Sequence, residues 1–123
     1  MDPAAPGATV GRIAVGDEWP GDQLDRAVAR FNAGEAARTV AGLTHTLGRP
    51  RVSIGAAAGS SSEVRVTVAW ELGWYQWCVD LGDERRPVFQ LDKGDEIDQL
   101  DGSARQWNAT ADERGRLALG APR

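Results

Sequence analysis

Apolar residues recur with a helical period in the first third of the chain. They form two stripes, each of which would cover one side of a helix. The first stripe is Leu24, Ala27, Val28 and Phe31, and the second is Ala36, Val40, Leu43 and Leu47. The stripes do not share a phase, because continuing the first would bury Glu35 and Arg38. The sequence therefore predicts two helices, at 22–31 and 33–47.

Polar residues and glycine mark the expected ends of these helices. Asp22 is suited to the N-cap of the first helix. Asn32 and Glu35 have the spacing of a capping box, which favours a break at this point and a new helix after it. Gly48 supplies the position that follows the second helix, and Pro50 prevents continuation.

From residue 51 onward the apolar pattern has a period of two, which is typical of strands. Strands are predicted at 51–55, 64–81, 87–91, 96–100, 106–111 and 116–119, with a further short strand at 9–15. Turns are expected at 92–95 and at 112–115, where Gly115 supplies a left-handed residue.

The segment 64–81 holds half of the eight aromatic side chains of the protein. As one straight strand it would span about 60 Å, whereas a compact chain of this length is only about 35–40 Å across. A turn is therefore expected at Gly73. With a two-residue loop at Leu72-Gly73, Trp70 pairs with Tyr75, Val68 with Trp77, Val66 with Val79, Val64 with Leu81, and Arg65 with Asp80. One face of this hairpin is then apolar and the other polar.

These elements predict an α+β fold in which two N-terminal helices pack on one face of an antiparallel β-meander. Residues 1–7 are rich in proline, alanine and glycine and are expected to be a disordered lead-in. Residues 8–123 are expected to form a single α+β domain.

The charge and composition of the chain narrow the classes of partner. The net charge is −4, whereas nucleic acid and anionic membranes require a basic surface, so neither is expected as a partner.

No apolar run is long enough for a transmembrane helix, and the N-terminus lacks the features of a signal peptide. A cytoplasmic location is expected, and the single cysteine fits a reducing compartment. Thirteen arginines against one lysine, with abundant alanine and glycine, suggest a GC-rich bacterium.

The residue inventory contains no catalytic constellation, so we expect a protein that is not an enzyme. His45 is the only histidine, and its place in the last turn of a helix favours a structural role. Cys78 falls on the polar face of the hairpin, away from where the helices should pack, which disfavours a dyad with His45. Glu71 lies near the aromatic residues but has no second carboxylate placed beside it. The serines at 60–62 lack the surroundings of a nucleophile elbow.

An acidic run between Asp92 and Asp101 is the best candidate for a metal site. Its spacing does not match a calcium-binding loop of the EF-hand type. Charges along an exposed strand also discourage aggregation, and we favour this interpretation over a weak calcium site. No metal ion and no cofactor are expected.

Trp74 is the one aromatic residue of the segment that points away from Trp70, Tyr75 and Trp77. Either another part of the chain covers it, or it forms an exposed apolar knob with Leu72 at the hairpin tip. The second alternative would give about 300 Å² of apolar surface, enough to mark an interaction site. The candidate interaction residues are Glu71, Leu72, Trp74 and Gln76.

Two functions remain open on these grounds. The first is a small non-enzymatic accessory or protein-interaction domain, which binds a protein partner or itself through the tip and polar face of the hairpin. The alternative is a small-molecule-binding domain with a pocket between the helices and the aromatic face of the sheet, which requires a cavity of at least about 300 Å³.

Overall fold

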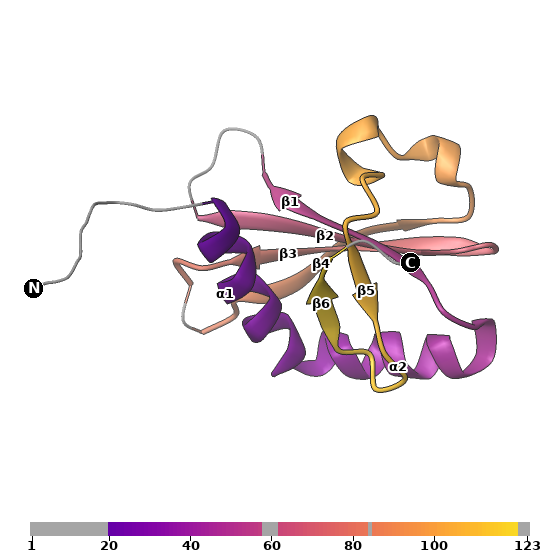
Figure 1. Ribbon diagram of the computed structural model, residues 1–123, viewed down its shortest axis with the longest axis horizontal. Coiled ribbons are helices and arrows are strands. Elements are labelled where there is room, and N and C mark those ends of the chain that lie inside the picture. The colour runs from indigo at the N-terminus through magenta and orange to yellow at the C-terminus, as the bar shows by residue number, and fades with distance from the viewer. Residues whose placement is uncertain (1–19, 58–61, 84, 121–123) are drawn as a thin grey trace, which may run out of the picture.

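The computed structural model describes residues 20–57, 62–83 and 85–120 and has the predicted α+β architecture. Two helices precede six antiparallel strands, which form one sheet in the order β4-β3-β2-β1-β5-β6 (Figure 1). The lead-in predicted at 1–7 and the strand predicted at 9–15 lie outside the described residues.

The two predicted helices are confirmed as α1 (Pro20–Asn32) and α2 (Glu35–Leu47). Their predicted N-caps are wrong. Because α1 begins at Pro20, Asp22 lies inside the helix. The N-cap of α2 is Gly34, with no side-chain hydrogen bond.

The Asn32 side chain joins α1 to a distant strand instead of capping α2. Its Nδ2 donates to the Leu117 carbonyl (3.1 Å), and its Oδ1 accepts from the Leu117 N–H (2.8 Å). An asparagine amide can satisfy both backbone groups of an edge residue in this way. At the other end of α2, Gly48 adopts the left-handed φ of 92° and donates its N–H to Thr44, as the sequence predicts.

The aromatic hairpin is built from β2 (Glu63–Trp70) and β3 (Gly73–Asp80), so its two-residue turn is Glu71-Leu72. The predicted register is wrong by two residues. Trp70 pairs with Gly73, Val68 with Tyr75, Val66 with Trp77, Val64 with Val79, and Arg65 with Cys78. A slip of two residues leaves every side chain on its original face, because side chains alternate with a period of two. The predicted division into an apolar and a polar face is therefore confirmed.

The strands that flank this hairpin follow the prediction only in part. Strand β1 (Arg51–Ala56) precedes it as expected. Strand β4 (Val88–Gly94) follows, but runs through the predicted turn at 92–95, aided by a bulge opposite Gln76 and Trp77.

The segment predicted as a strand at 96–100 is helical. It contains one 3₁₀ turn, η2 (Ile97–Gln99), and a second, η3 (Gly102–Ala104), follows it. The side chains of Glu96 and Gln99 form a capping box around η2, and Asp101 caps η3. Local hydrogen bonds of this kind favour the 3₁₀ turns over the strand that the apolar pattern predicts.

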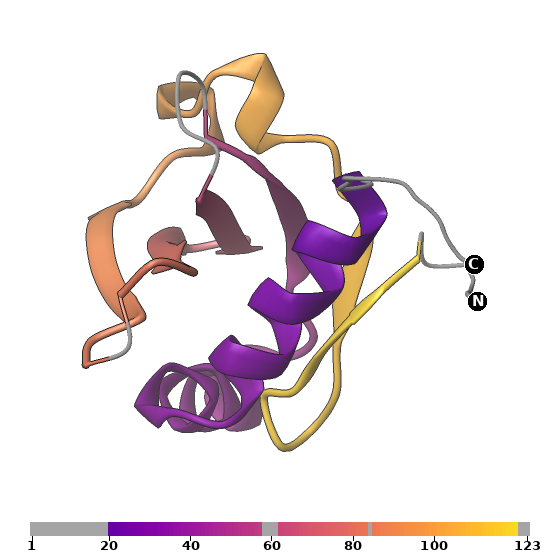
Figure 2. The same ribbon diagram turned by 90° about the vertical axis from the view of Figure 1, so that its left-hand side faces the viewer.

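Residues 95–108 cross the sheet on the face opposite the helices. This crossing places β5 (Ala109–Ala111) next to β1 and β6 (Leu117–Leu119) at the far edge. Figure 2 shows β4 at one side of the molecule and β5 and β6 at the other, with α2 seen end on below α1. Gly115 lies in the β5–β6 turn with a φ of +76°, as predicted, and packs directly on the backbone of α2 at Ala37 and Ala41.

Two apolar clusters hold the layers together. The main core lies between the helices and the sheet and includes Phe31, Val40, Val52, Ile54, Val66, Val68, Trp70 and Trp77. The smaller cluster lies on the opposite face, under η2 and η3, and contains Ala69, Trp74, Leu100 and Ala104. The second cluster contains Trp74, a residue of the predicted interaction site.

Candidate functional site

Trp74 is buried, which excludes the exposed knob. Only 4% of its surface is accessible. Leu100 and Ala104 pack on the ring, and the indole N–H donates to the Glu96 carbonyl at 2.8 Å. The chain that crosses the outer face thus covers the tryptophan, which is the first of the two alternatives left open by the sequence.

The other predicted interaction residues do not form one surface. Glu71 and Leu72 are exposed at the hairpin turn, and Leu72 has 74% of its surface accessible. Gln76 is half-buried, and its Nε2 donates to Thr67 Oγ1 at 3.1 Å. Of the four predicted residues, the two at the turn are exposed, Gln76 is partly accessible and Trp74 is buried.

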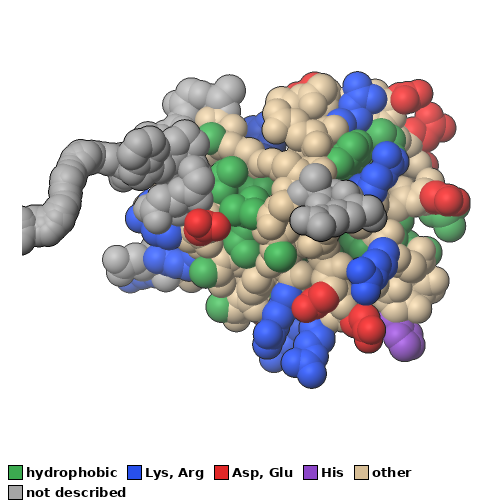
Figure 3. Space-filling model, viewed as in Figure 1, with side chains coloured by type: hydrophobic (Ala, Val, Ile, Leu, Met, Phe, Trp, Pro, Cys, Tyr) green, Lys and Arg blue, Asp and Glu red, His purple; other side chains and the backbone are tan. Residues whose placement is uncertain are grey.

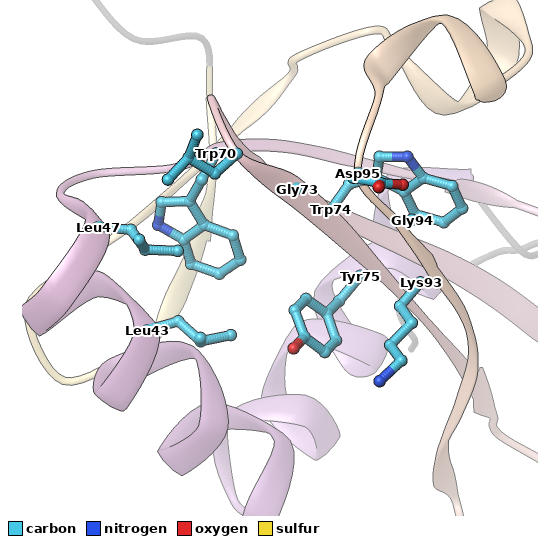
Figure 4. A pocket seen from close by; sticks show the side chains of 10 residues that line it. Leu43, Leu47, Trp70, Gly73, Trp74, Tyr75, Lys93, Gly94 and Asp95 are labelled. Carbon is cyan, nitrogen blue, oxygen red and sulfur yellow. The ribbon is translucent and has the colours of Figure 1, made fainter.

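A cavity of about 440 Å³ lies between α2 and the aromatic face of the hairpin, the location at which the small-molecule alternative requires a pocket. Figure 4 shows the Leu43 and Leu47 side chains of α2 facing Trp70 and Tyr75 of the hairpin, with the Lys93 ammonium beside the Tyr75 hydroxyl. Trp74 and Asp95 lie beyond the β3 ribbon in this view. The cavity has apolar walls and two polar groups at one side.

Local structure explains why this end of the molecule stays open. The buried residues of α2 are Ala36, Ala37 and Val40, all in its first half. In its second half the helix extends past the core, so Leu43 is half-buried and Leu47 is exposed. The indole N–H of Trp70 donates to the Gly48 carbonyl at 2.8 Å, which fixes the end of the helix against the hairpin.

A second cavity, of about 500 Å³, lies further along the same flank of α2. It is bounded by the junction between the helices, the floor residue Trp77 and the start of β4. Three arginines line it: Arg30, Arg85 and Arg86. Among the described residues, its other charged lining residue is Glu35.

Two of the large apolar side chains that reach solvent lie at the first cavity. Among the described residues, the large hydrophobic side chains that are exposed are Leu47, Leu72, Phe89 and Leu91. Leu47 and Leu72 line the first cavity. Phe89 borders the second cavity, but it pairs with Cys78, so its side chain points to the sheet face that α2 does not cover. Scattered exposed leucines are ordinary, but a group at one concave surface marks an interaction site.

A third cavity, of about 370 Å³, lies under η3 on the outer face, and its polar groups hold the fold together. The Ser53 hydroxyl accepts from the Gln106 N–H at 3.1 Å. The Asn108 amide bonds both the N–H and the carbonyl of Ile54, each at 2.8 Å. These bonds attach the crossing segment to β1, so we assign this cavity a structural role.

The residues considered for catalysis are not brought together. His45 is exposed on α2, whereas Cys78 lies on the sheet face that α2 does not cover. Within the described ranges, no three histidine, cysteine or acidic side chains converge as a metal site would require. In the acidic run, Asp101 instead accepts from the Ser103 hydroxyl and the Ala104 N–H, and these hydrogen bonds lower the pKa of its carboxyl group.

The Cys78 thiol should react slowly while the protein is folded. Burial, followed by the nearby charges of Glu63 and Asp80, raises its pKa, against a smaller opposing effect of Arg65. A raised pKa leaves less thiolate at any given pH, and the thiolate is the reactive species. At about pH 8, labelling by an aromatic disulfide should be at least about tenfold slower than in urea-unfolded protein. Equal rates would show that the side chain is accessible in the native state.

Sequence reasoning missed the contribution of α2 and β4 to the open cavities. Leu43 and Leu47 belong to a regular apolar stripe, which gives no sign that a cavity lies between them and the hairpin. Lys93 was placed in a turn, although it lies in β4 beside Tyr75. Lys93 is the only lysine among the fourteen lysine and arginine residues. This is a weak signal that the position belongs to a site.

None of the described helices is long and apolar enough to cross a membrane. No protein-family model matches the chain, and no curated protein or solved structure matches it either.

Proposed function

We propose that the protein is a non-enzymatic protein-interaction domain, and that apolar side chains of another protein dock between α2 and the hairpin. One observation carries the proposal. Two of the four large hydrophobic side chains that the described residues expose, Leu47 and Leu72, line the first cavity of this flank. Burying exposed apolar surface is the main driving force of association, at about 25 cal/mol per Å².

The shape of the site favours a protein over a small molecule. A small-molecule site usually encloses most of the ligand surface. Here the lining side chains Leu47 and Leu72 are themselves exposed, so the first cavity is open along one side. An open apolar groove suits side chains that a partner presents from its own backbone.

Replacement of Leu47 by glutamine tests the proposal, with His45→Gln as its control. Both positions are exposed in the last turn of α2, but only Leu47 lines the cavity. The probe is a phage-displayed library of random peptides about 16 residues long, longer than the groove in helical or extended form. Selected peptides should bind wild type and His45→Gln equally and Leu47→Gln at least about tenfold more weakly, a loss of about 1.4 kcal/mol.

Three other results would contradict the proposal. The first is that no peptide is enriched, and the second is that peptides bind Leu47→Gln as tightly as wild type. The third is a dimer, found by light scattering, that Leu47→Gln dissociates, because the occupant would then be a second copy of the chain.

A small-molecule function is the second candidate, and the volume of the first cavity supports it. At about 440 Å³, this cavity is larger than the roughly 300 Å³ at which ligand sites begin. The Tyr75 hydroxyl and the Lys93 ammonium would orient a bound molecule. A fragment screen by NMR that saturates at Tyr75, with no enriched peptide, would favour this candidate.

A further inference from the structure

The two cavities lie end to end along α2, and we refer to them together as the groove. A single row of the helix lines both: Glu35 and Thr39 border the second cavity, and Leu43 and Leu47 border the first. The floor is also continuous. Tyr75 borders one cavity and Trp77 the other, and their rings stack at 5.7 Å between centroids with an interplanar angle of 17°.

The length of the groove sets the size of the segment that can fill it. From Glu35 to Leu47 the helix rises about 18 Å, at about 1.5 Å per residue. A strand of about five or six residues covers the same distance, as does a helix of about twelve residues. A partner that fills the groove must therefore present a continuous segment, because one or two side chains would cover only part of its length.

The charges along the groove have the opposite sign to the protein as a whole. Within the part of the chain that the structure describes, its basic lining residues are Arg30, Arg85, Arg86 and Lys93, and its acidic ones are Glu35 and Asp95. Asp95 lies beyond the β3 ribbon, away from the side that Lys93 faces (Figure 4). The chain nevertheless carries a net charge of −4.

Outside the groove, charges of both signs are mixed. On the face shown in Figure 3, basic side chains lie at the lower edge, at the left and at the right, with acidic side chains among them. A basic groove on an acidic protein attracts a partner of complementary charge and raises its rate of association.

The free edge of β4 is poorly suited to pair with an added strand. Pro87 precedes the strand, and a bulge interrupts its register with β3. The Lys93 N–H is already bonded to the Asp92 carboxylate, at 2.8 Å. Such features protect an edge from pairing. A partner is then recognised by the side chains of the groove and not by strand pairing with β4.

We infer that the occupant of the groove is an acidic segment of another protein, with apolar residues that enter the first cavity and carboxylates that meet Arg85 and Arg86. This inference rests on the proposed function. Arginine suits the role because its planar guanidinium can bind a carboxylate through two parallel hydrogen bonds. The backbone N–H groups of both arginines are bonded to the Asp83 carboxylate, which holds the turn in place whatever side chains they carry.

The double variant R85Q/R86Q tests the charge requirement, with R38Q/R105Q as its matched control. Arg38 and Arg105 are exposed as well, but neither lines the groove. Peptides selected from the random library on wild type should be rich in aspartate and glutamate around apolar residues. R85Q/R86Q should bind them about tenfold more weakly, R38Q/R105Q less than about twofold more weakly, and wild-type affinity should fall as salt rises from about 50 to 300 mM.

The outcomes separate this inference from the proposed function. If Leu47→Gln abolishes binding but the selected peptides are not acidic, or R85Q/R86Q binds them normally, the groove docks apolar segments and the inference is wrong. If Leu47→Gln has no effect, both are wrong. Binding that R38Q/R105Q weakens as much as R85Q/R86Q does would reflect net charge alone and would also overturn the inference.

Discussion

Replacing Trp77 by alanine is expected to lower the free energy of unfolding by about 3–5 kcal/mol. The residue is 4% exposed and lies between the sheet and the helices. Phe31 meets its ring edge-on at 5.4 Å between centroids, and Tyr75 stacks on it at 5.7 Å. Truncation removes both ring contacts and leaves a cavity under the junction of α1 and α2. Urea denaturation followed by circular dichroism measures the change.

Leu72→Ala is the control for this prediction. Leu72 belongs to the same hairpin but is 74% exposed, so its truncation should change stability by no more than about 0.5 kcal/mol. The conservative variant Trp77→Phe should fall between the two, because it keeps an aromatic ring beside Phe31. A loss below about 1 kcal/mol in Trp77→Ala would mean that the ring is not part of the core.

The main features of the fold could be predicted because they depend on local periodicity. The change of phase between the apolar stripes located the break between the helices. The alternation along 64–81 assigned each hairpin side chain to its correct face, even though the register was wrong by two residues. Register depends on the turn. Glu71-Leu72 closes the hairpin instead of Leu72-Gly73, and neither dipeptide has the usual signature of a tight turn.

The path of the chain after β4 could not be predicted in the same way. Nothing in the local pattern indicates that 95–108 crosses the outer face or that β5 pairs with β1. The crossing depends on long-range bonds, such as those between Asn108 and Ile54, and on the capping of two short 3₁₀ turns. The long-range bonds form only when distant parts of the sequence meet, and the caps are contacts between polar groups, so apolar periodicity carries no trace of either.

The unpredicted crossing of 95–108 also explains why Trp74 was a candidate for an exposed interaction site. The sequence correctly separated Trp74 from the other aromatic residues, but its exposure depended on the unpredicted crossing. The cavities beside α2 depend on how closely the helix packs on the sheet it covers. That is a relation between layers, and it is set by element lengths and packing angles that no single segment encodes.

Replacing Trp74 by alanine is expected to destabilise the protein by about 3 kcal/mol. If the tryptophan were an exposed knob, the same change would leave stability within about 0.5 kcal/mol of wild type. Trp74 is the largest member of the outer cluster, and its indole N–H anchors the crossing segment at the Glu96 carbonyl. Its loss should therefore act first on η2 and η3 and only secondarily on the main core.

Hydrogen exchange can show whether η2 and η3 lose stability before the main core does. In Trp74→Ala, the Leu100 and Ala104 amides, which bond Ile97 and Asp101, should lose more protection than the amides of β2. Trp74→Phe keeps an aromatic ring but not the N–H donor, so it should cost only about 0.5–1.5 kcal/mol through the hydrogen bond, plus a smaller packing loss. If all amides lose protection equally in Trp74→Ala, the two clusters unfold as one unit. A stability unchanged from wild type would instead mean that the crossing segment does not depend on this tryptophan.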